Sequence, residues 1–209
     1  MKRVLIIGAS GFTSKYLYNF INSPDKEIFF CDLVNAFDKK LLRRWYKTDF
    51  SDFKEAYRII SEINPDQIYN LAGSFSNDFE TDYRNNVLLT KNIFDSILKL
   101  NINTRVLIIG SAAEYGVINI KDNPIKEDYK LNPASIYGLT KVFQTNLMTY
   151  YFNSKKINVV MVRTFNLIGK EIHKKLFIGS LFKQISEYKE KKINKIIVGN
   201  LDNKRDYIK

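Results

Sequence analysis

Five short apolar runs, rich in Val, Ile and Leu, recur along the chain and are separated by longer amphipathic stretches. Runs of this length that alternate with helix-length segments are typical of β-α units, in which helices connect parallel strands. Strands covered by helices on both faces become almost continuously apolar. The sequence therefore predicts an α/β fold with a doubly wound parallel sheet. The predicted strands are residues 3–7, 27–31, 67–72, 105–109 and 158–163.

Helices are predicted in the stretches between the apolar runs, and polar residues mark the ends of one of them. Ser51 and Asp52 can accept hydrogen bonds from the first amide groups of a helix that runs to Ile63, and Asn64-Pro65 ends it. The remaining helices are predicted over about residues 12–22, 82–100, 135–153 and 176–189, with a further short strand at 195–198.

The 209 residues suffice for one domain with a full core, or for one domain and part of a second. A single cysteine, Cys31, excludes a disulfide framework and suits a reducing compartment, so the cytoplasm is the predicted location. The apolar run after Arg3 stops at Gly8 and is too short for a signal peptide. No stretch approaches the roughly 20 apolar residues that cross a bilayer, so no membrane span is predicted.

The formal net charge of +11 leaves two interpretations open. A basic surface attracts phosphate and would suit a nucleic-acid partner. The lysines, however, occur singly or in pairs along the whole chain, as on an ordinary solvated surface, and a cleft for a nucleotide diphosphate would also be positive. We therefore predict no nucleic-acid partner. No metal site is predicted either, because the one histidine, His173, lies among lysines.

A pair of glycines, Gly8 and Gly11, stands where the first predicted strand meets the first helix. A tight turn and a close backbone approach to a pyrophosphate exclude side chains at such positions. The helix N-terminus then presents free amide groups and a positive dipole to the phosphates. Asp32 closes the next strand, 21 residues beyond Gly11, where its carboxylate can accept hydrogen bonds from both hydroxyls of an adenosine ribose. The sequence therefore predicts a dinucleotide site.

The carboxylate of Asp32 favours NAD over NADP, because it would repel a 2′-phosphate. Four nearby cations would compensate for that repulsion, so NADP remains an alternative cofactor. A turn aspartate at a strand end, without a ligand, is the other interpretation of Asp32. The four cations are Lys39, Lys40, Arg43 and Arg44.

The order of several motifs resembles that of the extended short-chain dehydrogenase/reductases, the NAD-dependent epimerase/dehydratase family. Residues 8–14 are similar to its Gly-x-x-Gly-Phe-x-Gly turn, except at Ser14, and residues 70–73 resemble its segment beside the cofactor. Residues 137–141 match its Tyr-x-x-x-Lys motif, and residues 163–169 resemble its Arg-x-x-Asn-x-x-Gly-Pro. The resemblance covers nearly the whole chain. It implies a Rossmann-like sheet, a nicotinamide cofactor and a nucleotide-sugar substrate.

Tyr137 and Lys141 are four residues apart, so both side chains project from one face of a helix. An ordinary tyrosine has a pKa of about 10, and a nearby ammonium favours the phenolate. Tyr137 is thus expected to exchange a proton with the substrate as general acid/base. The resemblance implies that Lys141 also holds the nicotinamide ribose and that Ser111 hydrogen-bonds the same sugar oxygen as Tyr137. A pair on a helix surface is the alternative interpretation of this spacing.

The resemblance also implies the residues that bind cofactor and substrate. Asn86 is expected near the substrate, with a capping or core asparagine as the alternative. Asn166, just past a strand end, is expected on the nucleotide-sugar, and Arg205 on its diphosphate, unless it is only a surface arginine. Ser111 completes the expected substrate contacts. The expected cofactor-binding residues are Gly8, Ser10, Gly11, Phe12, Asp32, Asp49, Leu71, Ala72, Tyr137 and Lys141.

The expected reaction follows from the same comparison. Dehydratases of the family carry an acidic residue two positions before the tyrosine of the segment that here contains Ser111 and Tyr115, and this chain has Ala113 there. Glu114 follows one position later and would point away from the site on extended backbone, or reach it from a turn. We therefore expect a 4-ketosugar reductase or epimerase, with 4,6-dehydration as an alternative. Residues 199–207 are similar to enzymes of GDP-deoxyhexoses, so a GDP-linked substrate is expected.

Two parts of the chain are expected, a dinucleotide-binding domain over residues 1–167 and a partial substrate lobe over residues 168–209. Family members usually continue beyond the Arg205-Asp206-Tyr207 segment, so the lobe is expected to be truncated. A catalytically weak dinucleotide-binding or regulatory protein is therefore the second hypothesis, and a nucleic-acid-binding module, based on charge alone, is the third. The resemblance also implies a homodimer.

Overall fold

The computed structural model describes residues 1–36, 43–170, 172–174, 176–202 and 204–208. The chain divides into two compact units, Met1–Arg163 and Thr164–Lys209, each described here by itself. This division lies four residues before the predicted domain boundary, between residues 167 and 168, and the assignment of a function to each part stays a prediction. Lys39 and Lys40, two of the cations considered beside Asp32, lie outside the described residues.

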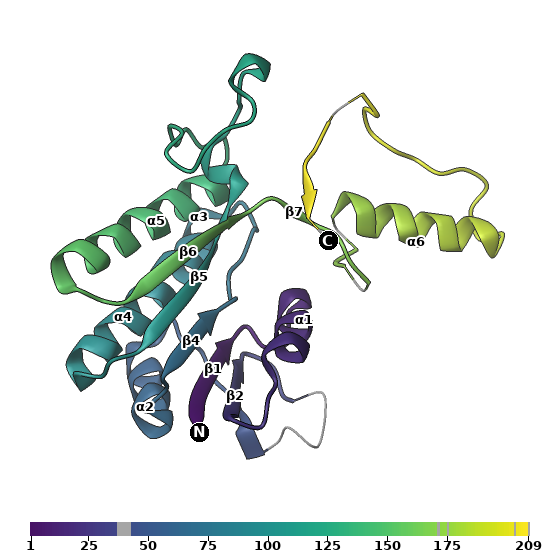
Figure 1. The fold of residues 1–209 in the computed structure, drawn as a ribbon. Helices are drawn as coiled ribbons and strands as arrows, with labels where there is room; N and C mark the ends of the chain where they lie inside the picture. The colour runs from purple at the N-terminus through teal and green to yellow at the C-terminus, as the bar shows by residue number, and fades with distance from the viewer. Residues whose placement is uncertain (37–42, 171, 175, 203, 209) are drawn as a thin grey trace. The chain divides into compact units, whose positions relative to one another are not determined.

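The first unit is built on a six-stranded sheet with the order β3-β2-β1-β4-β5-β6, and the strand pairs from β3 to β5 are parallel (Figure 1). This is the strand order of a Rossmann sheet, so the predicted fold class is confirmed. The strands are β1 (Lys2–Ile7), β2 (Lys26–Asp32), β3 (Trp45–Lys47), β4 (Gln67–Asn70), β5 (Arg105–Ser111) and β6 (Val159–Thr164).

Two cores form because side chains alternate along each strand. In β1, Leu5 and Ile7 belong to the core shared with α2, α4 and α5, whereas Val4 and Ile6 belong to the core shared with α1. Helices therefore cover both faces of the sheet (Figure 1). The helices are α1 (Phe12–Ile21), α2 (Phe53–Ile63), α3 (Phe79–Asp82), α4 (Leu89–Leu100) and α5 (Ile136–Lys155). None of the helices in the described part of the chain combines the length and apolarity needed to cross a membrane.

The predicted helix over residues 82–100 proves to be three consecutive helical segments. A π-helical turn, Tyr83–Leu88, separates α3 from α4. A π-helical turn contains one residue more than an α-helical turn. The apolar periodicity on either side of it is nearly that of one continuous helix, so the sequence pattern could not reveal the additional residue. The turn contains Asn86, which is fully buried.

Strand β3 was not predicted, because it has only three residues and lacks an apolar run. It extends the sheet beyond β2 through the pairs Phe30–Trp45 and Asp32–Lys47. The segment that follows it, Thr48 to Phe50, reaches the pocket described below.

The second unit holds α6 (Phe177–Lys189) and a two-stranded sheet of β7 (Asn166–Leu167) and β8 (Tyr207–Ile208). The predicted strand over residues 195–198 is wrong. Ile197 instead donates its N–H to Gln184 Oε1 at 2.8 Å and accepts from Gln184 Nε2 at 3.0 Å. A side chain of α6 thus takes both backbone groups that a neighbouring strand would have bonded.

One buried side chain ties α4 to the segment after β3. Asn92 is 3% exposed and donates to Phe50 O at 3.0 Å and to Ser51 O at 2.9 Å. Replacement of Asn92 by Ala leaves two buried carbonyl groups without this donor. We expect the free energy of unfolding to fall by about 1–3 kcal/mol, measured by urea denaturation. Lys91→Ala on the same helix removes only an exposed ion pair with Asp95 and should cost less than about 1 kcal/mol.

Candidate active site

The turn between β1 and α1 requires glycine. Gly8 has a φ of 81°, and a Cβ there would lie 2.6 Å from Ala72 N on the neighbouring strand end. No larger residue fits this conformation and this contact. Gly11 precedes α1 without a side-chain cap, so the first turn of the helix presents its amide groups. Ser14, which replaces the third glycine of the motif, is buried.

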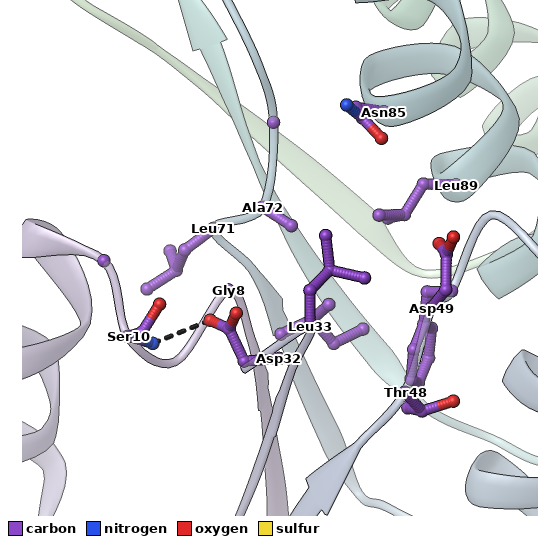
Figure 2. A pocket seen from close by; sticks show the side chains of 14 residues that line it. Gly8, Ser10, Asp32, Leu33, Thr48, Asp49, Leu71, Ala72, Asn85 and Leu89 are labelled. Carbon is purple, nitrogen blue, oxygen red and sulfur yellow. Dashed lines mark hydrogen bonds between the residues drawn. The ribbon is translucent and has the colours of Figure 1, made fainter. Parts of the chain in front are cut away.

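A pocket opens at the carboxyl edge of β1, β2 and β4 (Figure 2). It brings together seven of the predicted cofactor-binding residues. Phe12, Tyr137 and Lys141 are not among its lining residues, and the Phe12 ring packs at a tilt against Tyr16, with centroids 5.0 Å apart. The seven are Gly8, Ser10, Gly11, Asp32, Asp49, Leu71 and Ala72. Gly73, in the segment that resembles the family's cofactor-side residues, also lines the pocket. The sequence did not indicate the lining residues Leu33, Thr48, Phe50, Asn85 and Leu89.

Asp32 closes β2 at the wall of the pocket. Its carboxylate accepts a hydrogen bond from Ser10 N at 2.8 Å, drawn in Figure 2, and one from Val34 N at 3.4 Å. The charge is thus fixed beside the glycine turn rather than being free to rotate. Of the nearby cations, Arg44 forms an ion pair with Glu27 at 3.7 Å.

Asp49 lies on the opposite wall and joins two segments of the pocket. It accepts from Arg84 Nη2 at 2.6 Å and from Ser51 N at 2.8 Å. Arg84 Nε also donates to Ser51 Oγ at 2.7 Å. These bonds hold the segment after β3 against the π-helical turn, which places Asn85 and Leu89 in the pocket lining.

The structure brings Ser111, Tyr137 and Lys141 together. Ser111 ends β5, and its Oγ accepts the N–H of Ala113 at 3.1 Å. Tyr137 lies in the first turn of α5, where the Ser111 hydroxyl is near enough to lower the pKa of its phenol. Lys141 follows one turn later, with Nζ 5.9 Å from the centre of the Tyr137 ring. A hydroxyl, a phenol and an ammonium therefore meet at the end of a central strand.

Burial is the largest influence on Tyr137 and raises its pKa above the ordinary value. The hydrogen bond with Ser111 lowers the pKa, while the charges of Glu114 and Asp82 raise it further. The pKa of Tyr137 thus lies above its ordinary value, whereas the sequence predicted a lowered one; the role of Tyr137 as general acid/base stays a prediction. At neutral pH Tyr137 is a neutral phenol, which is a proton donor.

Lys141 is itself 4% exposed, and burial lowers its pKa to about 8. Its Nζ donates to Ile109 O and to Gln144 Oε1, both at 3.0 Å. An ammonium has three N–H donors, so these two acceptors fix its direction and use two of them. Gln144 is buried and donates in turn to Thr90 Oγ1 at 2.7 Å, which links α5 to α4.

Asn86 lies beneath the site and uses its whole amide within the protein. Its Oδ1 accepts from Ser74 N at 3.0 Å, and its Nδ2 donates to Ser74 O and Thr140 Oγ1, both at 3.0 Å. A Cβ on Gly73 would lie 2.7 Å from Asn86 Oδ1 and 3.4 Å from Lys141 Nζ, so the loop packs closely against both groups at Gly73. This geometry matches the core alternative for Asn86, and a contact with substrate stays a prediction.

Glu114 faces the interior and does not reach the site. It is fully buried, forms an ion pair with Arg163 Nε at 3.0 Å, and accepts from Thr145 Oγ1 and Ser111 N. The segment Ala112–Glu114 is a 3₁₀ turn, and its capping bonds orient the carboxylate inward. Of the two alternatives left open for Glu114, the carboxylate points away from the site, although the segment is a turn and not extended backbone. Ala113, at the position of the dehydratase acid, has no ionisable group.

Two predicted substrate residues belong to the second unit. Asn166 Nδ2 donates to Asp206 O at 2.9 Å within the small sheet, and Arg205 is exposed just before β8. Their contact with a substrate stays a prediction. His173 is also exposed, and the described residues contain no group of three or more metal-ligating side chains.

Comparison with known proteins decides the family. The model of the NAD dependent epimerase/dehydratase family matches residues 4–209. The chain belongs to this family. Its resemblance to the short-chain dehydrogenase/reductases, inferred from the motifs, is therefore confirmed.

Curated relatives and solved structures agree with this family. GDP-6-deoxy-D-mannose reductase of Pseudomonas aeruginosa is 24% identical over 99% of this chain and 66% of its own length. UDP-glucose 4-epimerase of Lactobacillus helveticus is 25% identical over 80% of this chain and 52% of its own length. The structure of RMD from Pseudomonas aeruginosa with NADPH has a TM-score of 0.82 and 23% identity, and it covers 100% of this chain and 69% of that one. This chain thus spans about half to two thirds of the length of these relatives.

The buried ammonium of Lys141 predicts a dependence of stability on pH. Because its folded pKa, about 8, lies below the value of 10.5 for an exposed lysine, the unfolded chain binds more protons between these pH values. Stability should therefore rise with pH in this window, relative to a variant without the amine. We expect the free energy of unfolding of the wild type to rise by on the order of 2 kcal/mol more than that of Lys141→Met between pH 8 and pH 10. Urea denaturation at each pH measures it, with the exposed Lys91→Met as control.

Proposed function

We propose that this protein is an NAD(P)-dependent nucleotide-sugar oxidoreductase, a 4-ketosugar reductase or epimerase, with Tyr137 as general acid/base. The observation that carries the proposal is the meeting of Ser111, Tyr137 and Lys141 at the end of β5, on the sheet edge that also carries the glycine cradle. Ligands of open α/β sheets bind at this edge.

The pocket residues fit a dinucleotide. The turn at Gly8 leaves no room for a Cβ, the first amide groups of α1 are presented for a pyrophosphate, and Asp32 provides a carboxylate for a ribose. Leu33, Leu71 and Leu89 supply apolar surface for a base. A bound nicotinamide would accept or donate hydride. NAD is the proposed cofactor, and NADP the alternative.

The chain's own groups suit reduction of a ketone. Tyr137, with its raised pKa, holds a proton that it can give to a carbonyl oxygen. The Ser111 hydroxyl lies near this phenol, and the two acceptors of Lys141 leave one N–H of its ammonium for a ribose hydroxyl. The absence of a carboxylate at Ala113 and the inward direction of Glu114 favour reduction or epimerisation over 4,6-dehydration.

The finer assignments belong to the same proposal. A GDP-linked deoxyhexose is supported by the similarity of residues 199–207 and by the match to GDP-6-deoxy-D-mannose reductase. Contacts of Asn166 and Arg205 with the nucleotide-sugar, a homodimer, and a place in the cytoplasm are proposed on the sequence resemblance and the single cysteine.

Turnover tests the proposal directly. Incubation with GDP-4-keto-6-deoxymannose and NADH or NADPH should lower the absorbance at 340 nm. Tyr137→Phe should reduce the rate by about 100-fold or more, because it removes the transferred proton. Tyr57→Phe on α2 is the matched control and should retain the rate. If neither NADH nor NADPH is oxidised, the reductase assignment is removed, and full activity of Tyr137→Phe would remove the acid/base role.

Asp32 should set the choice between the two cofactors. Asp32→Asn keeps an oxygen that can accept the Ser10 N–H but removes the negative charge. We expect the ratio of NADPH to NADH affinity to rise about tenfold, measured by the fluorescence of the bound reduced cofactor. Asp52→Asn, which preserves the N-cap of α2, should leave the ratio unchanged. An unchanged ratio in Asp32→Asn would show that Asp32 does not face the ribose.

A further inference from the structure

The loop after β4, residues 73–78, is organised around one buried carboxylate. Asp82 is fully buried, and it accepts from Ser74 Oγ at 2.8 Å, from Ser76 N and Oγ at 2.9 Å each, and from Asn77 N at 3.0 Å. Four donors from three polar residues of one short loop thus converge on one side chain. A buried carboxylate is stable only when such donors replace its water.

The same loop lies against the acid/base residue. Asn77 Oδ1 accepts the N–H of Tyr137 at 3.4 Å, in the first turn of α5. The Phe75 ring meets the Tyr137 ring edge-on, with centroids 6.4 Å apart, and it is 51% exposed. Phe75 therefore forms an apolar wall beside the phenol while much of its own surface remains open.

The loop is held at a second point by Asn86, through the two hydrogen bonds with Ser74 described above. Asp82 and Asn86 are both buried and lie four residues apart across the start of the π-helical turn. Two buried side chains of the helical segment thus hold the loop by hydrogen bonds. Phe75 and Asn77 of the same loop contact Tyr137.

We propose that Asp82 is a positioning residue of this active site: it fixes the loop so that Asn77 and Phe75 hold Tyr137 in place and shape the wall next to the reacting sugar. The claim that the loop lies next to the reacting sugar rests on the proposed function. The claim that Asp82 holds the loop against Tyr137 does not depend on it.

The charge of Asp82 adds a second effect. Burial raises the pKa of Asp82, but the hydrogen bonds from Ser76, Ser74 and Asn77 together lower it by more than burial raises it. The net pKa shift is downward, so the carboxyl group is ionised at neutral pH. This charge raises the pKa of both Tyr137 and Lys141. Glu114 raises both as well, and the Lys141 ammonium faces the Tyr137 ring.

Asp82→Asn tests the inference without substrate or cofactor. The variant is nearly the same size but lacks the charge, and its amide NH₂ faces donors rather than acceptors. With ¹³C-labelled tyrosine, assigned through Tyr137→Phe, NMR titration should show the pKa of Tyr137 lowered by on the order of half a unit. The amide hydrogens of Ser76 and Asn77 should exchange at least about tenfold faster. If the protein turns over, kcat should fall while KM for the cofactor stays the same.

Asp78→Asn is the matched control. Asp78 is an exposed carboxylate of the same loop that caps α3 through Thr81 N at 2.9 Å, and Asn caps equally well. It should change neither the pKa of Tyr137 nor the exchange rates.

Two results would overturn the inference: an Asp82→Asn variant with an unchanged Tyr137 pKa and unchanged exchange, or equal effects from Asp78→Asn. Should Asp82→Asn fail to fold, Ser76→Ala keeps the charge and removes one donor. Faster exchange at Asn77 in that variant supports the inference, and unchanged exchange overturns it. A wild-type protein without turnover would count against the proposed function only, because the NMR measurements do not depend on it.

Discussion

The parallel pairing of β1, β4 and β5 brings three separate segments of the chain to one edge of the sheet. In the register of these strands, Ile7 lies opposite Asn70, and Asn70 lies opposite Ile108. The glycine turn, the loop after β4 and the Ser111 turn therefore begin side by side. The site depends on this alignment, since a slip of one residue would turn each side chain to the other face.

Three buried charged groups lie near Tyr137. Asp82 and Glu114 are fully buried, and Lys141 is nearly so. Each is satisfied by fixed partners, such as Ile109 O for the ammonium and Arg163 for Glu114, which is the condition for keeping a charge out of water. The cost of desolvation appears in the raised pKa of Tyr137 and the lowered pKa of Lys141. At neutral pH these two shifts leave Tyr137 protonated and bring the pKa of the Lys141 amine to about 8.

Most of the sheet and much of the site followed from local patterns. The apolar runs predicted β1, β2, β4, β5 and β6. In β1 this run reflects burial on both faces, whereas Val160 and Val162 of β6 are exposed. Gly8 was predicted because a tight turn excludes a side chain there, and the structure adds its positive φ and its close contact with Ala72. The short β3, the π-helical turn and the inward direction of Glu114 could not be predicted. Each depends on partners distant in the sequence, such as Arg163 for Glu114.

By itself the amino-acid sequence determined the class of sheet, the glycine cradle and the spacing that puts Tyr137 and Lys141 on one helix face, because periodicity and steric exclusion act within a few residues. Only the tertiary structure decided the protonation of Tyr137, since desolvation depends on everything packed around it. The tertiary structure also decided the contacts of Asn86 and Asp82, because nothing in the sequence pattern distinguishes these polar residues from exposed ones. Folding buries both beneath the loop after β4 and turns their polar atoms to Ser74, Ser76 and Asn77.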